Sequence, residues 1–140
     1  MKFYIATRLE NAANHNLLRD LMVEQGHSIT YDWTVHGPVW REGAERIREV
    51  SELELKGVAD ANVCLVLMPG GRGTHVELGI ALGLQKPCLV ISENAQELMA
   101  TSETCAFYHH PRVLRVSLQH LGLHQANIPA LAASWVSTNW

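Results

Sequence analysis

The chain has 140 residues, of which 47% are hydrophobic and 18% are charged, a composition typical of a globular protein of one domain, residues 1–140. Its formal net charge of −3 gives no electrostatic basis for binding a nucleic acid polymer. The sequence has no apolar run long enough to span a membrane and no signal peptide, so a cytoplasmic location away from membranes is expected.

The first half of the chain alternates between strand and helix patterns. Residues 2–6 are apolar and predict a short strand, and apolar residues at helical spacing over about 11–25 predict a helix that ends before Gly26. Residues 27–34 alternate and are rich in β-forming residues, which predicts a second strand. A charged amphipathic helix is expected over 41–59.

The second half is organised around a buried strand and the turn that follows it. Residues 63–68 are apolar without alternation, as in a parallel strand that is buried on both faces. Pro69, Gly70 and Gly71 break this strand, and helical spacing resumes over 74–84. The elements expected after that helix are a strand over 88–91, a short helix over 92–99, a strand over 108–116 and a largely helical tail over 117–140.

This alternation of strands and helices predicts a parallel sheet of five strands with helices on both faces. In such sheets ligands bind beyond the carboxyl ends of the strands. The residues expected to contact a ligand there are Ala6, Thr7, Arg8, Trp33, His36, Gly70, Gly71, Arg72, Gly73 and Thr74.

Glu77 lies next to the glycine-rich stretch, and two interpretations of it remain open. Thr74 and Glu77 have the spacing of a capping box, in which both side chains satisfy backbone amides of the helix start. Alternatively, Gly70, Gly71 and Gly73 let the backbone approach a ligand, and the helix N-terminus offers that ligand free amides and partial positive charge. A capping box has no need of these glycines, which favours the ligand site.

Three segments, over 2–6, 26–30 and 77–82, resemble the nucleoside 2-deoxyribosyltransferase family, and the resemblance extends over roughly residues 1–92. It implies a flavodoxin-like or Rossmann-like three-layer α/β sandwich with a mainly parallel five-stranded sheet. It also implies that Glu77 is a nucleophile that attacks the anomeric carbon of a nucleoside, expels the base and forms a glycosyl-enzyme ester. Water or a second base then takes the sugar.

Two positions depart from that family. Glu54 falls where the family carries an aspartate near the reacting centre, and Gly71 stands where the transferases often carry an acidic residue. Residues 69–77 instead match Pro-Gly-Gly-x-Gly-Thr-x-x-Glu, which is similar to the motif of nucleoside-monophosphate phosphoribohydrolases. Those enzymes cut the same N-glycosidic bond and hold a 5′-phosphate on the glycine-rich turn.

The chemistry implied by these resemblances requires an ionised carboxylate and a proton donor for the leaving base. A helix N-terminus favours the ionised form of Glu77. Glu54, His36 and His75 are candidates for the proton donor, although Glu54 also fits the solvated face of a charged helix and His36 an ordinary loop position. We expect His75 to face solvent or a neighbouring subunit.

The remaining candidates concern the ligand's other groups. Arg8 and Arg72 lie in loops at the expected phosphate end of the crevice, and each has the alternative of an ordinary surface arginine. The indole rings of Trp33 and Trp40 could stack on a base, and the alternative for each is a buried tryptophan of the core. His109 with His110 and His120 with His124 have the spacing of metal ligands without a third ligand, so no metal and no cofactor are expected.

The tail over 117–140 has more apolar and aromatic residues than one helix packed on its own sheet requires. This surplus predicts a homodimer or higher homo-oligomer in which the tail lies at the interface, and the family resemblance nominates Asn127 there.

Three functions follow from the sequence. The leading one is an enzyme that cleaves or transfers at the N-glycosidic bond of a (deoxy)nucleoside or its 5′-monophosphate. The second is a non-catalytic nucleotide sensor in which Glu77 only caps its helix. The third is a structural oligomerisation module, which does not explain the glycine-rich stretch.

Overall fold

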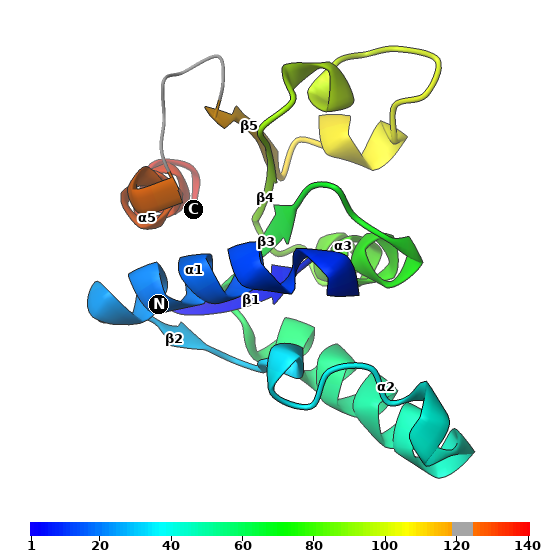
Figure 1. Cartoon of the computed structure of the whole chain (residues 1–140). Coiled ribbons are helices and arrows are strands. Elements are labelled where there is room, and N and C mark those ends of the chain that lie inside the picture. The colour runs from blue at the N-terminus through cyan, green and yellow to red at the C-terminus, as the bar shows by residue number, and fades with distance from the viewer. Residues whose placement is uncertain (119–124) are drawn as a thin grey trace.

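A computed structural model describes residues 1–118 and 125–140. In these residues five strands form one sheet in the order β2-β1-β3-β4-β5, and every neighbouring pair is parallel (Figure 1). The strands are β1 (Lys2–Ala6), β2 (Ser28–Ile29), β3 (Val63–Leu67), β4 (Cys88–Ser92) and β5 (Val113–Ser117). The predicted α/β fold with a five-stranded parallel sheet is confirmed.

Helices cover both faces of the sheet, which gives three layers (Figure 1). They are α1 (Ala12–Glu24), α2 (Ala44–Asp60), α3 (Arg72–Gly83) and α5 (Ile128–Asn139). Short 3-10 turns occur at Leu9–Asn11, Trp33–Val35, Trp40–Glu42, Ala95–Leu98, Ala106–His109 and Gln125–Asn127. The expected short helix over 92–99 is therefore a 3-10 turn.

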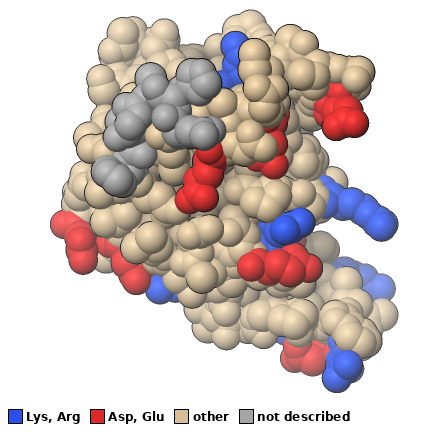
Figure 2. Space-filling view, turned by 45° about the horizontal axis from the view of Figure 1, so that its top comes forward, with Lys and Arg blue, Asp and Glu red and all other residues tan. Residues whose placement is uncertain are grey.

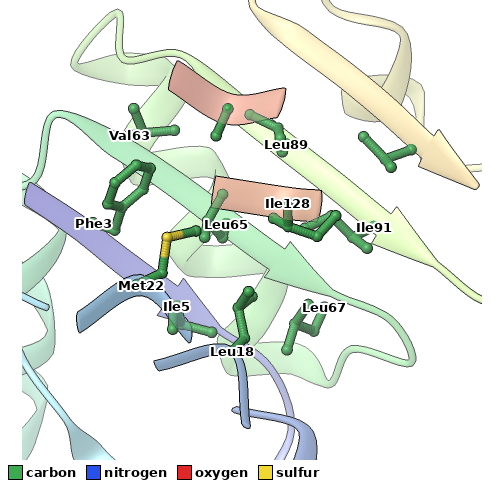
Figure 3. Close-up of a cluster of buried hydrophobic side chains, with 12 residues drawn as sticks. Phe3, Ile5, Leu18, Met22, Val63, Leu65, Leu67, Leu89, Ile91 and Ile128 are labelled. Carbon is green, nitrogen blue, oxygen red and sulfur yellow. The ribbon is translucent and has the colours of Figure 1, made fainter. Parts of the chain in front are cut away.

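One face of the sheet packs against α1 and α5. Leu18 and Met22 from α1 and Ile128 from α5 meet alternate residues of the strands, among them Phe3 and Leu65 (Figure 3). All five side chains are fully buried. Burial of apolar surface of this kind stabilises the fold by roughly 1.5–3 kcal/mol for each large side chain.

The opposite face packs against α2 and α3, which carry the candidate catalytic residues. Tyr4 and Cys64 from the strands contact Val58 of α2 and Leu78 and Ala81 of α3. Because each central strand is covered on both faces, its sequence is apolar without alternation. The same packing fixes the position of α2 and α3 relative to β1 and β3.

The second strand is shorter than predicted. Only Ser28–Ile29 pairs with β1, in place of the expected 27–34. Asp32 ends the extended segment, because its carboxylate accepts hydrogen bonds from the Thr34 amide at 2.9 Å and from Arg19 on α1 at 2.8 Å. These bonds start a 3-10 turn and turn the chain away from the sheet edge.

The tail packs on its own sheet to a larger extent than expected. Ile128, Pro129 and Ala132 of α5 are buried, and Trp135 packs against the same cluster. Trp140 remains 51% exposed. Residues 119–124, which include His120 and His124, lie outside the described residues. The oligomer with the tail at its interface stays a prediction.

The surface and the helix lengths bear on possible partners. Among residues 1–118 and 125–140, no helix is long and apolar enough to cross a membrane. The face drawn in Figure 2 carries acidic and basic side chains interspersed, without a broad basic area.

Candidate active site

The turn over residues 69–73, called the glycine-rich turn below, connects β3 to α3 at the carboxyl edge of the sheet. The helix begins at Arg72, two residues earlier than predicted. The expected capping box is wrong in its partners, because Thr74 accepts a hydrogen bond from the Gly71 amide at 3.0 Å and lies inside the helix. Thr74 thereby closes the turn, and Glu77 lies in the second helical turn.

Gly70 is the glycine of the turn that packs most tightly. A Cβ atom placed on it would lie 2.8 Å from Cγ2 of Thr74 and 3.3 Å from Cε1 of His75. A Cβ atom on Gly73 would meet nothing within 4 Å. Gly70 is therefore required by packing within the protein, and the close approach of these glycines to a ligand stays a prediction.

Glu77 points inward, toward the sheet. Its side chain is 7% exposed, and the Tyr4 hydroxyl donates a hydrogen bond of 2.5 Å to Oε1. Burial raises the pKa of Glu77 to about 8; the Tyr4 hydrogen bond opposes this rise and the charge of Glu54 adds to it. Burial therefore favours the protonated form of Glu77 in the unbound protein, against the ionised form that the helix N-terminus one turn away favours.

Tyr4 is a site residue that the sequence did not reveal. It was interpreted as a core residue, and its ring is indeed fully buried in the cluster beneath α2 and α3. Only the tertiary structure shows that its hydroxyl reaches Glu77. A tyrosine within an apolar strand was the available signal, since a buried hydroxyl needs a partner.

Glu54 on α2 belongs to the same site. Its charge raises the pKa values of both Tyr4 and Glu77, which places its carboxylate near them. Gly57, one turn later, lets α2 approach the sheet, since a Cβ there would lie 2.7 Å from Tyr31 Cβ and 3.0 Å from the Tyr4 ring. Sequence analysis missed this role of Gly57.

The environment of Glu54 favours the protonated carboxylic acid. Burial raises its pKa, and His36 partly opposes this rise. Among residues 1–118 and 125–140, no side chain or amide forms a hydrogen bond with it. A half-buried carboxyl group with a raised pKa and no hydrogen-bond partner among the described residues is a candidate proton donor to a ligand.

His36 lies at the same edge but is engaged by its neighbours. Its Nδ1 lies 2.6 Å from the Gly37 carbonyl oxygen, and its Nε2 lies 2.6 Å from the Tyr31 hydroxyl. A carbonyl oxygen only accepts, so Nδ1 carries the proton and Nε2 accepts from Tyr31. Both ring nitrogens of His36 are thus engaged by residues of its own loop.

His75 faces inward, contrary to expectation. Its Nδ1 lies 2.7 Å from the Gly71 carbonyl oxygen and its Nε2 lies 2.6 Å from the Tyr108 hydroxyl. Both ring nitrogens are therefore occupied by the turn and by the 3-10 turn Ala106–His109. This leaves Glu54 as the candidate proton donor.

Two predicted ligand contacts are instead packing residues. Ala6 is fully buried, and Trp33 is 5% exposed with its indole N–H donating to the Ile5 carbonyl at 3.3 Å. Thr7 is also buried, and its hydroxyl donates to the Leu67 carbonyl at 2.9 Å, at the end of β3. The Thr7 bond ties the end of β1 to the strand that leads into the turn, and the Trp33 bond ties the 3-10 turn Trp33–Val35 to β1. Trp40, by contrast, is 64% exposed.

Arg8 and Arg72 flank the glycine-rich turn. Both are exposed, and a Cβ atom on Gly71 would lie 3.4 Å from Cβ of Arg8, so the two loops run side by side. Arg8 has one ion-pair contact, to Glu10 at 3.9 Å, and Arg72 has no ion-pair partner in the part of the chain that is described. Two guanidinium groups beside helix amides suit an anion.

A cavity of about 450 Å³ lies on the other side of the turn and has a different chemistry. Met68, Glu97, Glu103 and Tyr108 are among its lining residues, and neither lysine nor arginine lines it. Glu77 does not reach this cavity. The carboxylates and arginines therefore locate the candidate site better than the cavity does.

The sheet order and the glutamate on the helix after β3 define a flavodoxin-like α/β domain. Among solved structures, the chain is similar to the CMP N-glycosidase BcmB of Clostridium botulinum, with a TM-score of 0.63, over 96% of this chain and 99% of that chain. The two share 13% identity, so the likeness shows a common fold and confirms the expected nucleoside deoxyribosyltransferase-like architecture. No protein-family model and no curated protein matches the sequence.

Proposed function

We propose that the protein cleaves or transfers at the N-glycosidic bond of a (deoxy)nucleoside or its 5′-monophosphate. The observation that carries this proposal is the buried Glu77 carboxyl, held by the Tyr4 hydroxyl behind a glycine-rich turn. The fold shared with an N-glycosidase supports the same class of chemistry.

In the first step Glu77 attacks the anomeric carbon. Tyr4 holds Oε1, so Oε2 is the oxygen that forms the new bond to carbon. The bond between carbon and the base nitrogen breaks, and its electron pair stays on the base. Glu77 must be ionised to attack. In the transition state its negative charge stabilises the positive charge that develops on the sugar.

Glu54 is proposed to protonate the departing base. Burial raises the pKa of Glu54 above its ordinary value, which favours the protonated form that a proton donor needs. After the base leaves, the Glu54 carboxylate accepts a proton from the incoming water or second base. That acceptor attacks the anomeric carbon and releases Glu77, which closes the cycle.

The phosphate of a monophosphate substrate is proposed to bind at the glycine-rich turn. Arg8 and Arg72 flank the turn, and the first amides of α3 have no partner within the helix. Because BcmB is a CMP N-glycosidase, pyrimidine monophosphates are the first substrates to test here.

One observation favours the non-catalytic sensor as a second candidate. A Glu77 whose pKa is about 8 is mostly protonated at neutral pH, and a protonated glutamate bonded to a tyrosine also serves as a buried structural contact. In that case a nucleotide binds at the turn without losing its base.

The decisive experiment is incubation with a panel of nucleosides and 5′-monophosphates, followed by chromatography for the free base. The wild type is compared with Glu77→Ala and with Glu93→Ala, an exposed glutamate that serves as the control. Base release by the wild type and Glu93→Ala, together with a sugar adduct on Glu77 by mass spectrometry, supports the enzyme. Binding without base release by any of the proteins supports the sensor.

A further inference from the structure

Tyr108 and His75 connect the glycine-rich turn to a distant segment of the chain. The Tyr108 side chain is 4% exposed and belongs to the 3-10 turn between β4 and β5. Its hydroxyl lies 2.6 Å from Nε2 of His75 and 3.4 Å from the sulfur of Met68, so it contacts residues on both sides of the turn.

The hydrogen-bond roles in this contact follow from the carbonyl of Gly71. That oxygen accepts from the His75 backbone amide at 3.2 Å and from His75 Nδ1 at 2.7 Å, so both of its lone pairs are engaged. Because that oxygen can only accept, Nδ1 must carry the proton, and Nε2 lies in hydrogen-bond contact with the Tyr108 hydroxyl, which also reaches the Met68 sulfur. Tyr108 therefore fixes the orientation of the ring, and the ring fixes the carbonyl.

The fixed carbonyl matters for an anion. A backbone oxygen that turned toward a phosphate would repel it, whereas amides attract it. A turn with glycines at 70, 71 and 73 has unusual backbone freedom, so its preferred conformation has to be imposed by contacts from outside. Thr74 supplies one contact, through the Gly71 amide, and His75 supplies the other, through the Gly71 carbonyl.

We propose that Tyr108 and His75 are positioning residues that hold the glycine-rich turn in its anion-binding conformation. This inference rests on the proposed function only in placing a phosphate at the turn. It assigns Tyr108, which touches neither Glu77 nor Glu54, a role in the affinity for phosphorylated ligands. The effect is expected on the phosphate, because Tyr108 contacts His75, which holds the Gly71 carbonyl, and the hydroxyl that bonds to Glu77 is that of Tyr4.

The test uses ribose 5-phosphate and ribose as probes, because they differ only by the phosphate and need no base cleavage. Affinities are measured by calorimetric or NMR titration of the full chain. Tyr108→Phe keeps the ring and should bind ribose 5-phosphate about three- to tenfold more weakly, as expected for one neutral hydrogen bond, with ribose unaffected. His109→Asn, an exposed neighbour in the same 3-10 turn, is the control and should bind like the wild type.

His75→Asn distinguishes the effect of the His75–Tyr108 contact from a general effect of packing. Asparagine can still donate to the Gly71 carbonyl but is too short to reach Tyr108. Adding Tyr108→Phe to His75→Asn should therefore cause no further loss of affinity, because the shared contact is already gone. Melting temperatures of all variants identify any that are unfolded at the assay temperature.

Full affinity of Tyr108→Phe, an equal loss for ribose, additive losses in the double variant, or a wild type that does not bind ribose 5-phosphate would each overturn the inference. Coupled losses confined to the phosphorylated probe support it. If those losses are found while no nucleoside or nucleotide loses its base, the catalytic proposal fails and the positioning role stands.

Discussion

The hydroxyl of Tyr4 on β1 donates a hydrogen bond of 2.5 Å to Oε1 of Glu77 on α3. The two residues are 73 positions apart in the sequence, and the packing of α3 against the sheet brings them together. This bond favours the ionised form of Glu77, while burial and the charge of Glu54 favour the protonated form. The balance sets the pH at which Glu77, the proposed nucleophile, becomes ionised.

Replacing Tyr4 by phenylalanine should move the activity profile to higher pH. The hydrogen bond lowers the pKa of Glu77, so its removal raises that pKa further. The ascending limb of kcat/KM against pH reports this shift. A Tyr4→Phe enzyme whose ascending limb coincides with that of the wild type would show that the hydroxyl does not tune Glu77.

The stability of the protein should depend on pH through Glu77. Its folded pKa, about 8, lies above its ordinary value of 4.5, so the folded state holds a proton that the unfolded state releases between these values. The stabilisation is complete below pH 4.5 and is lost as pH rises through 8. The free energy of unfolding lost in this way is on the order of a few kcal/mol.

Glu77→Gln removes this titration. Denaturant unfolding at several pH values should therefore show the wild type losing stability relative to Glu77→Gln from about pH 5 to pH 8, with the difference constant above that range. Parallel stability curves for the two proteins would mean that Glu77 titrates normally in the folded state.

Glu54→Gln should slow cleavage in proportion to the base's need for a proton. Substrates with an ordinary base should react about 10²- to 10⁴-fold more slowly, whereas a nucleoside analogue with an activated leaving group should lose little. Glu52→Gln, on the solvent side of the same helix, is the control. A uniform loss with both kinds of leaving group would assign Glu54 a binding role in place of proton transfer.

Two alanine substitutions in the glycine-rich turn should have opposite effects on stability. At Gly70 a methyl group collides with the Thr74 side chain, so Gly70→Ala should destabilise by about 1–3 kcal/mol. At Gly73 nothing lies within 4 Å and the residue is helical, so Gly73→Ala should be neutral or stabilise by about 0.5–1 kcal/mol. Thermal denaturation of the two variants measures both effects, and equal melting temperatures would contradict the packing at Gly70.

Arg72→Ala should weaken 5′-monophosphate binding by roughly ten- to a hundredfold and leave nucleoside binding nearly unchanged, because a charge-assisted contact contributes about 1.5–3 kcal/mol. Calorimetric titration with a matched nucleoside and monophosphate makes the comparison. Equal losses for both ligands would place the phosphate away from Arg72. Arg48→Ala, at an exposed position on α2, controls for the change in net charge.

The sequence by itself determined the fold class and the position of the glycine-rich turn. Unbroken apolar runs such as 63–67 indicate a strand that is covered on both faces. Gly26, at φ +81°, follows the end of α1, as the sequence indicated. The sequence also singled out Glu77 and Glu54, because local spacing and a family resemblance are both carried by neighbouring residues. Strand two failed as a prediction because its boundary depends on Asp32 binding Arg19, thirteen residues away.

The tertiary structure decided how these residues act. Burial against the sheet sets the protonation of Glu77, and no local pattern encodes the depth of a side chain. The partners Tyr4, Gly57 and Tyr108 come from three other elements, and each looks like ordinary core or loop in sequence. A site of this kind is assembled by long-range packing, so its acid–base chemistry is a property of the folded chain and not of any one of its segments.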